Sequence, residues 1–229
     1  MFNRLTPGKN LELVKWVAVI LMALDHINKY LFNWTIPGLF EAGRLAMPLF
    51  AFVLASHLAN PDFTKPNYIR LWRKLAFFGV ISTPFFVALG GVHGVLPLNI
   101  LFTLLVASAV VFFIRSNKLW SAGAVFASTG LFVEFIWLGV ATTVAAWLFL
   151  RSPHKATTLI VLLLTVASLY FVNHNFYAIA SLPAFYLLSK IPMQIPRLPY
   201  FFYMFYPSHL ALLLLVRIPM ASAGYLFLI

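Results

Sequence analysis

Long apolar runs that follow one another along the chain most restrict how it can fold. They cover roughly residues 13–32, 39–59, 75–90, 96–114, 119–134, 136–150, 156–173, 176–190 and 199–217. A helix needs about 20 apolar residues to cross the hydrocarbon of a bilayer. A soluble domain of 229 residues, 62% of them hydrophobic and only 9% charged, could not hide so much apolar surface from water. The sequence therefore predicts an all-α fold: one integral membrane domain, residues 1–229, with about nine transmembrane helices.

The basic residues predict the orientation of this bundle. Lys and Arg collect in the cytoplasmic loops of membrane proteins. With the N-terminus in the cytoplasm, all of the 16 Lys and Arg residues except Lys29, Arg44 and Arg217 fall at inner loops or inner helix ends. Those residues are Arg4, Lys9, Lys15, Lys65, Arg70, Arg73, Lys74, Arg115, Lys118, Arg151, Lys155, Lys190 and Arg197. We predict a cytoplasmic N-terminus and a multi-pass protein of the bacterial inner membrane. The net charge of +11 then needs no nucleic-acid partner.

Residues 119–150 allow two arrangements. Basic residues flank the segment at both ends, so it should enter and leave the membrane on the same side. Two short transmembrane helices satisfy this requirement, and so does a re-entrant hairpin covered by other helices.

Titratable residues inside the apolar runs are rare, because a charge near the bilayer centre costs about 2.5–3.5 kcal/mol on insertion scales. Lys15 and His26 are eleven residues apart, so they share one helix face and lie about 16 Å apart along its axis. Lys15 should lie at the cytoplasmic entrance, where an anionic cofactor could arrive. His26 should lie just beyond the midplane, with Asp25 beside it. An imidazole titrates near neutral pH and therefore suits general-base catalysis.

Several polar residues of other helices are expected at a similar depth, in the central or outer half of their spans. They are Arg44, Asn99, Glu134 and His209. Polar pairs that only hold helices together need not lie at the same depth in the membrane. The common depth expected for these residues therefore favours a functional site. A structural interpretation remains open. Lys15 would then be a boundary residue whose side chain extends to the membrane interface, and Asp25 would be neutralised in an ion pair with Lys29 or Arg44.

Other kinds of site have less support in the sequence. Cysteine is absent, and no HExxH, DxD or acidic cluster suggests a metal ion, so we expect no metal site. The Gly-x-Ser-x-Gly turn of serine hydrolases is also absent. The basic segment with Lys65, Arg70, Trp72, Arg73 and Lys74 could contact a nucleotide phosphate. The orientation of the protein already explains these charges, however, and membrane lipids are the default partners of the segment.

The motifs that contain these residues resemble the TraX family, and the resemblance spans positions 15 to 210. The motifs are Met22-Ala-Leu-Asp25-His26-Ile27, Gly43-Arg44-Leu-Ala-Met-Pro48-Leu-Phe-Ala-Phe52, Asn99-Ile-Leu-Phe-Thr103 and Phe205-Tyr206-Pro207-Ser208-His209-Leu210. Met47 departs from the pattern, in which Phe is usual. The Lys15-x10-His26 spacing is also similar to the Arg/Lys-x10-His motif of acyltransferase-3 membrane enzymes, which use cytoplasmic acetyl-CoA.

The resemblance implies an acetyl-CoA-dependent acetyltransferase. It implies His26 as general base, with Asp25, Arg44 and His209 in the surrounding catalytic site. On the acetyl-CoA side it implies Lys15 near the phosphates and Asn99 in the site, and the basic inner loops with Arg70 and Arg73 could assist. The expected acceptor is the amine of a pilin-like N-terminus, or a hydroxyl of an envelope glycan.

Two other classes of function remain as alternatives. In a proton-coupled transporter, Asp25, His26 and Glu134 would form a proton relay. The inverted repeats of many transporters are not visible in the sequence, which weighs against this class. The third possibility is a structural assembly protein without chemistry.

Overall fold

The structure is a computed structural model, and it describes residues 11–90, 96–193, 195–198 and 200–225. Within these residues the chain is helical, and an isolated bridge between Leu98 and Val133 is the one β-type contact. The predicted all-α class is confirmed.

The helices follow one another in the order α1 (Leu11–Leu31), α2 (Pro37–Gly43), α3 (Ala46–Ala59), α4 (Lys65–Gly90), α5 (Ile100–Arg115), α6 (Leu119–Thr129), η2 (Gly130–Phe132), α7 (Ile136–Arg151), α8 (Lys155–Ser168), α9 (Tyr170–Asn173), η3 (Tyr177–Ala180), α10 (Ser181–Lys190) and α11 (Phe201–Ser222).

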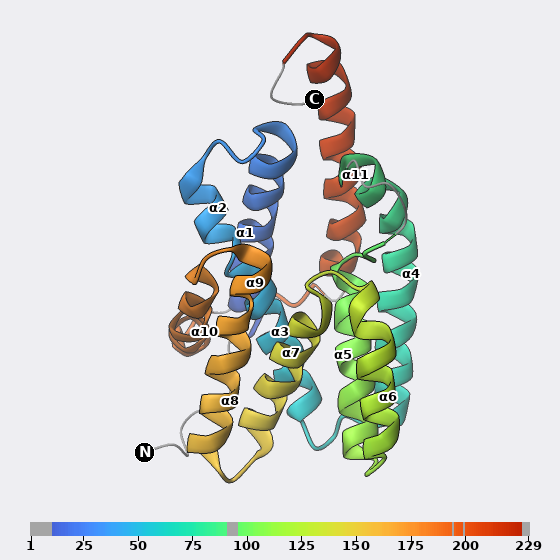
Figure 1. The fold of residues 1–229 in the computed structure, drawn as a ribbon, viewed down its shortest axis with the longest axis vertical. Helices are drawn as coiled ribbons and strands as arrows, with labels where there is room; N and C mark the ends of the chain where they lie inside the picture. The colour runs from blue at the N-terminus through green and yellow to red at the C-terminus, as the bar shows by residue number, and fades with distance from the viewer. Residues whose placement is uncertain (1–10, 91–95, 194, 199, 226–229) are drawn as a thin grey trace.

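Most of the longer helices run up or down the bundle, and three of the basic joints lie at one end of it (Figure 1). The joints at 60–64, 116–118 and 152–154 lie at the bottom in this view, whereas the joints at 32–36 and 130–135 lie higher. We call the bottom the basic end, because Lys65, Arg115, Lys118, Arg151 and Lys155 lie in or beside its joints. Arg4 and Lys9, which the orientation argument also used, lie outside the described residues.

The predicted apolar ranges each contain one helix or two consecutive helices, with three differences at their boundaries. The range 39–59 is broken into α2 and α3 at Arg44 and Leu45. Helix α4 begins at Lys65, ten residues before the predicted start. Helix α5 begins at Ile100 because the Asn99 side chain accepts a hydrogen bond from the Leu101 amide (3.2 Å) and caps the helix.

Residues 119–150 form two antiparallel helices, α6 and α7, joined by the short helix η2 (Figure 1). Helix α6 packs against α5, and α7 packs against α3, α5 and α8. Whether both cross the bilayer or form a re-entrant hairpin stays a prediction.

Four helical stretches of the described residues are long and apolar enough to cross a membrane. They are Pro37–Ala59, Lys65–Gly90, Lys155–Asn173 and Phe201–Ser222. Helices α5 and α7 and the stretch Leu119–Phe132 are apolar but shorter. Helix α1 has 21 residues but carries Glu12, Lys15, Asp25 and Lys29. These features agree with a membrane protein, and the crossing of all nine segments remains a prediction.

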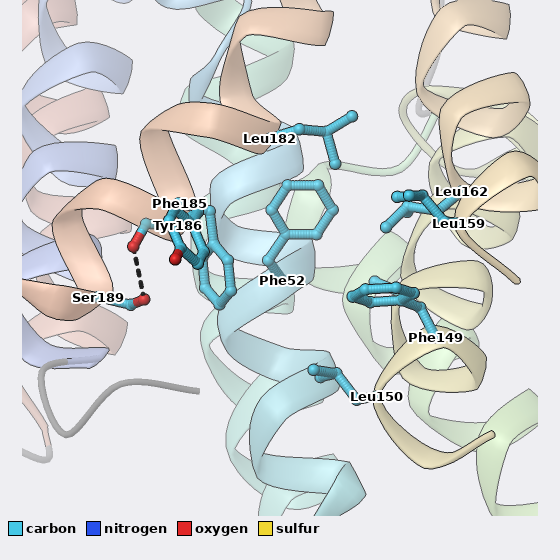
Figure 2. Close-up of a pocket in the computed structure, with 10 residues that line it drawn as sticks. Phe52, Phe149, Leu150, Leu159, Leu162, Leu182, Phe185, Tyr186 and Ser189 are labelled. Atoms are coloured by element: carbon cyan, nitrogen blue, oxygen red, sulfur yellow. Dashed lines mark hydrogen bonds between the residues drawn. The ribbon is translucent and has the colours of Figure 1, made fainter. Parts of the chain in front are cut away.

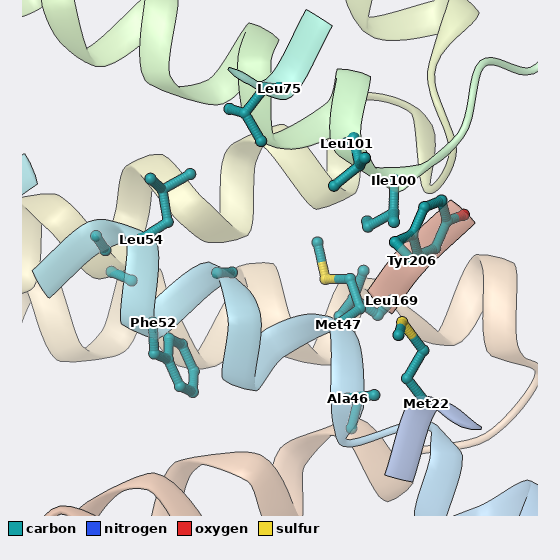
Figure 3. Packing of buried hydrophobic residues seen from close by; sticks show 14 of the residues in the cluster. Met22, Ala46, Met47, Phe52, Leu54, Leu75, Ile100, Leu101, Leu169 and Tyr206 are labelled. Carbon is teal, nitrogen blue, oxygen red and sulfur yellow. The ribbon is translucent and has the colours of Figure 1, made fainter. Parts of the chain in front are cut away.

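Helix α3 is the central helix of the core, and it packs against α1, α5, α7 and α10. Its Leu49, Ala51 and Ala55 are fully buried, and the small alanines allow neighbouring helices to approach closely. At its start, Met47 meets Met22, Ile100 and Tyr206 of three other helices (Figure 3). This contact between α1, α3, α5 and α11 brings together the segments on which the sequence placed the site.

Candidate active site

Two histidines from opposite ends of the sequence are hydrogen-bonded in the interior. The distance from His26 Nδ1 on α1 to His209 Nε2 on α11 is 2.7 Å. The two side chains are buried, and their rings are nearly parallel, with an interplanar angle of 6° and centroids 5.0 Å apart. The other ring nitrogen of His209, Nδ1, lies 2.9 Å from the Phe205 carbonyl oxygen one turn earlier in α11. The packing of α1 on α11 thus joins two of the predicted catalytic residues.

An ion pair lies beside the histidines. Arg44 Nη2 donates to Asp25 Oδ1 at 2.5 Å, and both side chains are largely buried. Gly43 permits this contact, because a Cβ atom at that position would overlap the Asp25 side chain. Arg44 also donates from Nε to the Phe40 carbonyl (3.1 Å) and from Nη1 to Asn173 Oδ1 (3.3 Å). The pair of Asp25 with Arg44, one of the two structural alternatives, is therefore present, and it lies next to His26.

A small cavity of about 50 Å³, which we call the inner cavity, adjoins these groups. Its wall contains Asp25, His26, Arg44 and Glu134, four of the polar residues expected at one depth. The rest of the wall consists of Met22, Gly43, Ala46, Met47, Phe50, Ile100, Phe135, Asn173 and Tyr206. His209 is not part of this wall and reaches the cavity only through His26.

Glu134 reaches the inner cavity from the joint between η2 and α7. Its amide donates to the Leu98 carbonyl (2.7 Å), and its carbonyl accepts from the Thr103 hydroxyl (2.6 Å). The next two residues, Phe135 and Ile136, have positive φ angles of 62° and 46°. Non-glycine residues seldom adopt this conformation, and such strain persists where the surrounding structure imposes it, often at functional sites. No pattern in the sequence indicates this backbone geometry.

A larger cavity of about 410 Å³ lies between α3, α4, α5 and the beginnings of α1 and α11. We call it the cationic cavity, because Lys15, Arg70 and Lys74 line it together with His57. Lys15 is paired with Glu12 (Nζ to Oε1, 2.7 Å). Phe50 lines both the cationic and the inner cavity, so the two are neighbours across this side chain.

Lys74 was not among the predicted site residues, whereas Arg73 was. Lys74 lines the cationic cavity between Leu71 and Leu75, but Arg73 is exposed on the surface of α4 and lines neither cavity. A signal was available, since Leu71 and Leu75 are one turn apart and mark the inward face of the helix, next to Lys74.

Asn99 lines neither cavity, and its side chain is hydrogen-bonded to α4 and to the start of α5. Its Nδ2 donates to the Gly79 carbonyl (2.9 Å) and the Thr83 hydroxyl (3.3 Å), while its Oδ1 caps α5. Of the eight predicted site residues, the structure therefore groups Asp25, His26, Arg44 and His209 around the inner cavity. It places Lys15 and Arg70 at the cationic cavity, and Arg73 and Asn99 elsewhere.

A third cavity, of about 190 Å³, lies among α3, α7, α8 and α10 and is lined mostly by Leu and Phe side chains (Figure 2). Its polar lining residues are Tyr186 and Ser189, and the Ser189 hydroxyl donates to the Tyr186 carbonyl (2.9 Å). With no acid, histidine or base in its wall, this cavity offers no group for transfer chemistry. In the part of the chain that the structure describes, no three His, Asp or Glu side chains are grouped as a metal site would require.

Comparisons with known proteins agree with the resemblance seen in the motifs. The sequence profile of the TraX family, described as TraX protein, matches residues 10–217. A protein named TraX from Escherichia coli is 29% identical over an alignment of 223 positions that covers 91% of this chain and 87% of that protein. A second TraX protein, from strain K12, is 30% identical over 154 residues, 66% of this chain and 57% of the relative.

A relative with a different name comes from Dichelobacter nodosus. It is called a probable fimbrial assembly protein FimC, serogroup H1, and is 28% identical over 87% of this chain and 92% of its own length. No solved structure matches the chain.

Proposed function

The chain belongs to the TraX family, and from this membership and its two neighbouring cavities we propose that it is a membrane-embedded acetyltransferase. It would move an acetyl group from cytoplasmic acetyl-CoA to an acceptor in the bacterial envelope. The observation that carries the proposal is the position of His26, in a small cavity separated by one side chain from a cavity lined with cations.

The cationic cavity suits the phosphate-bearing part of acetyl-CoA. Lys15, Arg70 and Lys74 present two ammonium groups and a guanidinium, which bind phosphate oxygens by charge-assisted hydrogen bonds. The joint at 60–64, on the basic end, connects α3 and α4, two of the helices that line this cavity. Under the predicted orientation this end faces the cytoplasm, where acetyl-CoA is made. The thioester would then extend past Phe50 to His26.

The chemistry follows from a base and a cation in one small space. A nitrogen of the histidine pair removes a proton from the acceptor amine or hydroxyl, whose heteroatom attacks the thioester carbonyl carbon. Arg44 has five N–H groups and uses three in the bonds described above, so it can donate to the developing oxyanion. The C–S bond then breaks, and the CoA thiolate leaves and takes up the proton from the histidine. The net products are the acetylated acceptor and CoA thiol.

For the acceptor we propose the N-terminal amine of a pilin-like subunit. One relative carries the name of a fimbrial assembly protein, which supports an acceptor of this kind. A hydroxyl of an envelope glycan is the second candidate, and the same base could deprotonate it.

Acetyl-CoA turnover by the purified protein tests the proposal directly. Incubated in detergent or nanodiscs with acetyl-CoA labelled on the acetyl group, the protein should bind acetyl-CoA and either hydrolyse it slowly or transfer label to a pilin-derived peptide. Absence of binding and turnover, together with a proton-coupled flux in vesicles, would instead establish the transporter in which Asp25, His26 and Glu134 form a relay.

The adjacent residues Lys74 and Arg73 test where the phosphates bind. We expect Lys74→Gln to weaken acetyl-CoA binding about tenfold, the loss of one charge-assisted hydrogen bond of roughly 1.4 kcal/mol. Arg73→Gln removes the same charge from the same turn of α4 but outside the cavity, and should leave binding unchanged. Isothermal titration with acetyl-CoA and with desulfo-CoA measures both variants. Equal losses would show that only the overall charge of α4 matters.

A further inference from the structure

The two histidines have different roles in the hydrogen-bonded pair. We propose that His26 is the base through its Nε2 atom, and that His209 is a positioning residue that fixes the tautomer of His26. This assignment rests on the acetyl transfer proposed above. Three features of the structure lead to this assignment.

The Phe205 carbonyl sets the direction of the hydrogen bonds. A carbonyl oxygen can only accept, so the His209 Nδ1 atom at 2.9 Å must carry a proton. In a neutral imidazole the other nitrogen, Nε2, is then unprotonated and can only accept. Its partner at 2.7 Å, His26 Nδ1, must therefore be the donor. The bare nitrogen of a neutral His26 is thus Nε2.

The position of this bare nitrogen fits a base. His26 lines the inner cavity and His209 does not. Among the described residues, Nε2 of His26 has no hydrogen-bond partner. The member of the pair that lines the cavity, His26, is therefore also the one that carries the unbonded, unprotonated nitrogen.

The ring geometry shows that the bond between the histidines is well aligned. The ring centroids are 5.0 Å apart and the bonded nitrogens are 2.7 Å apart. For two imidazole rings with this N···N distance, such a centroid separation is about the largest possible. It is reached only when both nitrogens lie on the line between the two centroids. With an interplanar angle of 6°, the rings meet edge to edge in nearly one plane. The N–H of His26 then points directly along the lone pair of His209, the orientation that a strong hydrogen bond prefers.

This arrangement gives His209 a function when His26 takes up a proton. The imidazolium formed on His26 keeps its Nδ1–H bond to His209, which stabilises the positive charge and holds the ring in place, as a third group orients the base in other catalytic sites. Asp25 does not fill this role, because the one hydrogen bond its side chain makes within the described residues is with Arg44.

Two substitutions separate this role from simple packing. In His209→Gln, the amide oxygen can still accept from His26 Nδ1, so kcat should stay within about fivefold of the wild type. In His209→Leu no acceptor remains, and kcat should fall about 100-fold while the KM for acetyl-CoA stays unchanged. Equal activity of the two variants, or a loss confined to KM, would contradict the assignment.

A second measurement does not depend on activity. In protein labelled with 15N-histidine and placed in nanodiscs, NMR should show a protonated Nδ1 and a bare Nε2 on His26, with scalar coupling from His26 Nδ1 to His209 Nε2 across the hydrogen bond. A bare Nδ1 on His26 would overturn the assignment. Observation of the expected tautomers in a protein that does not turn over acetyl-CoA would refute the proposed function and leave the pairing of the histidines intact.

Discussion

Replacement of His26 by alanine is expected to reduce acetyl transfer by about 10²–10⁴-fold, the usual contribution of a positioned general base. The substitution removes the imidazole that lines the inner cavity and leaves His209 without its partner. Acetyl-CoA should still bind, because the cations of the other cavity are unchanged. Loss of kcat with retained binding is therefore the expected result, measured as label transfer and as titration with acetyl-CoA.

His154→Ala provides the matched control, since His154 is exposed at the start of α8 on the basic end and should be replaceable without effect on kcat. If transfer survives His26→Ala, the proposed mechanism is wrong even though the family assignment stands. Accumulation of acetylated wild-type enzyme with ping-pong kinetics, absent in His26→Ala, would give His26 the role of nucleophile instead of base.

Much of the fold was predictable because two strong physical rules act on the sequence. Burial of backbone polar groups in hydrocarbon forces apolar segments into helices, so the apolar runs translate directly into helical segments. The preference of Lys and Arg for one side of the membrane predicted that the basic joints would lie on one side, and three of them, at 60–64, 116–118 and 152–154, share one end of the bundle.

The boundaries of individual helices were less predictable, because local contacts between helices determine them. Helix α4 extends ten residues before its apolar run, with Trp72 donating to the Ser108 hydroxyl of α5 (2.9 Å). The break between α2 and α3 at Arg44 depends on the approach of Gly43 to Asp25 on another helix. Neither contact has a signature in the hydropathy of the sequence.

The members of the candidate site were predictable, and the ion pair of Asp25 with Arg44 was one of the predicted alternatives, but the bond between the two histidines was not predicted. Depth in the membrane predicted that Asp25, His26, Arg44 and His209 belong together. The choice between His209 and Asp25 as the neighbour of His26 depended on how α11 rotates against α1, which no local pattern specifies. Expected depth and the family resemblance also assigned Asn99 to the site, although its side chain caps α5.

Loss of the Arg44 side chain should give the largest effect on stability. We expect Arg44→Met to lower the free energy of unfolding by about 3–5 kcal/mol, the usual cost of leaving one member of a buried ion pair without its partner. The substitution removes the bonds to Asp25, Asn173 and the Phe40 carbonyl and leaves the Asp25 carboxylate in a largely buried position. Unfolding of the purified variant in mixed micelles, followed by circular dichroism, measures the change.

A double variant distinguishes the unpaired charge from lost packing. Asp25→Asn in the Arg44→Met background removes the uncompensated carboxylate and should recover a substantial part of the lost stability, because a neutral amide costs far less to bury than a carboxylate. Arg73→Met, on the exposed face of α4, serves as the control and should change stability by no more than about 0.5 kcal/mol. If the double variant is as unstable as Arg44→Met alone, the packing of the Arg44 side chain over the Phe40 and Trp34 rings stabilises the helices, and the ion pair with Asp25 adds little.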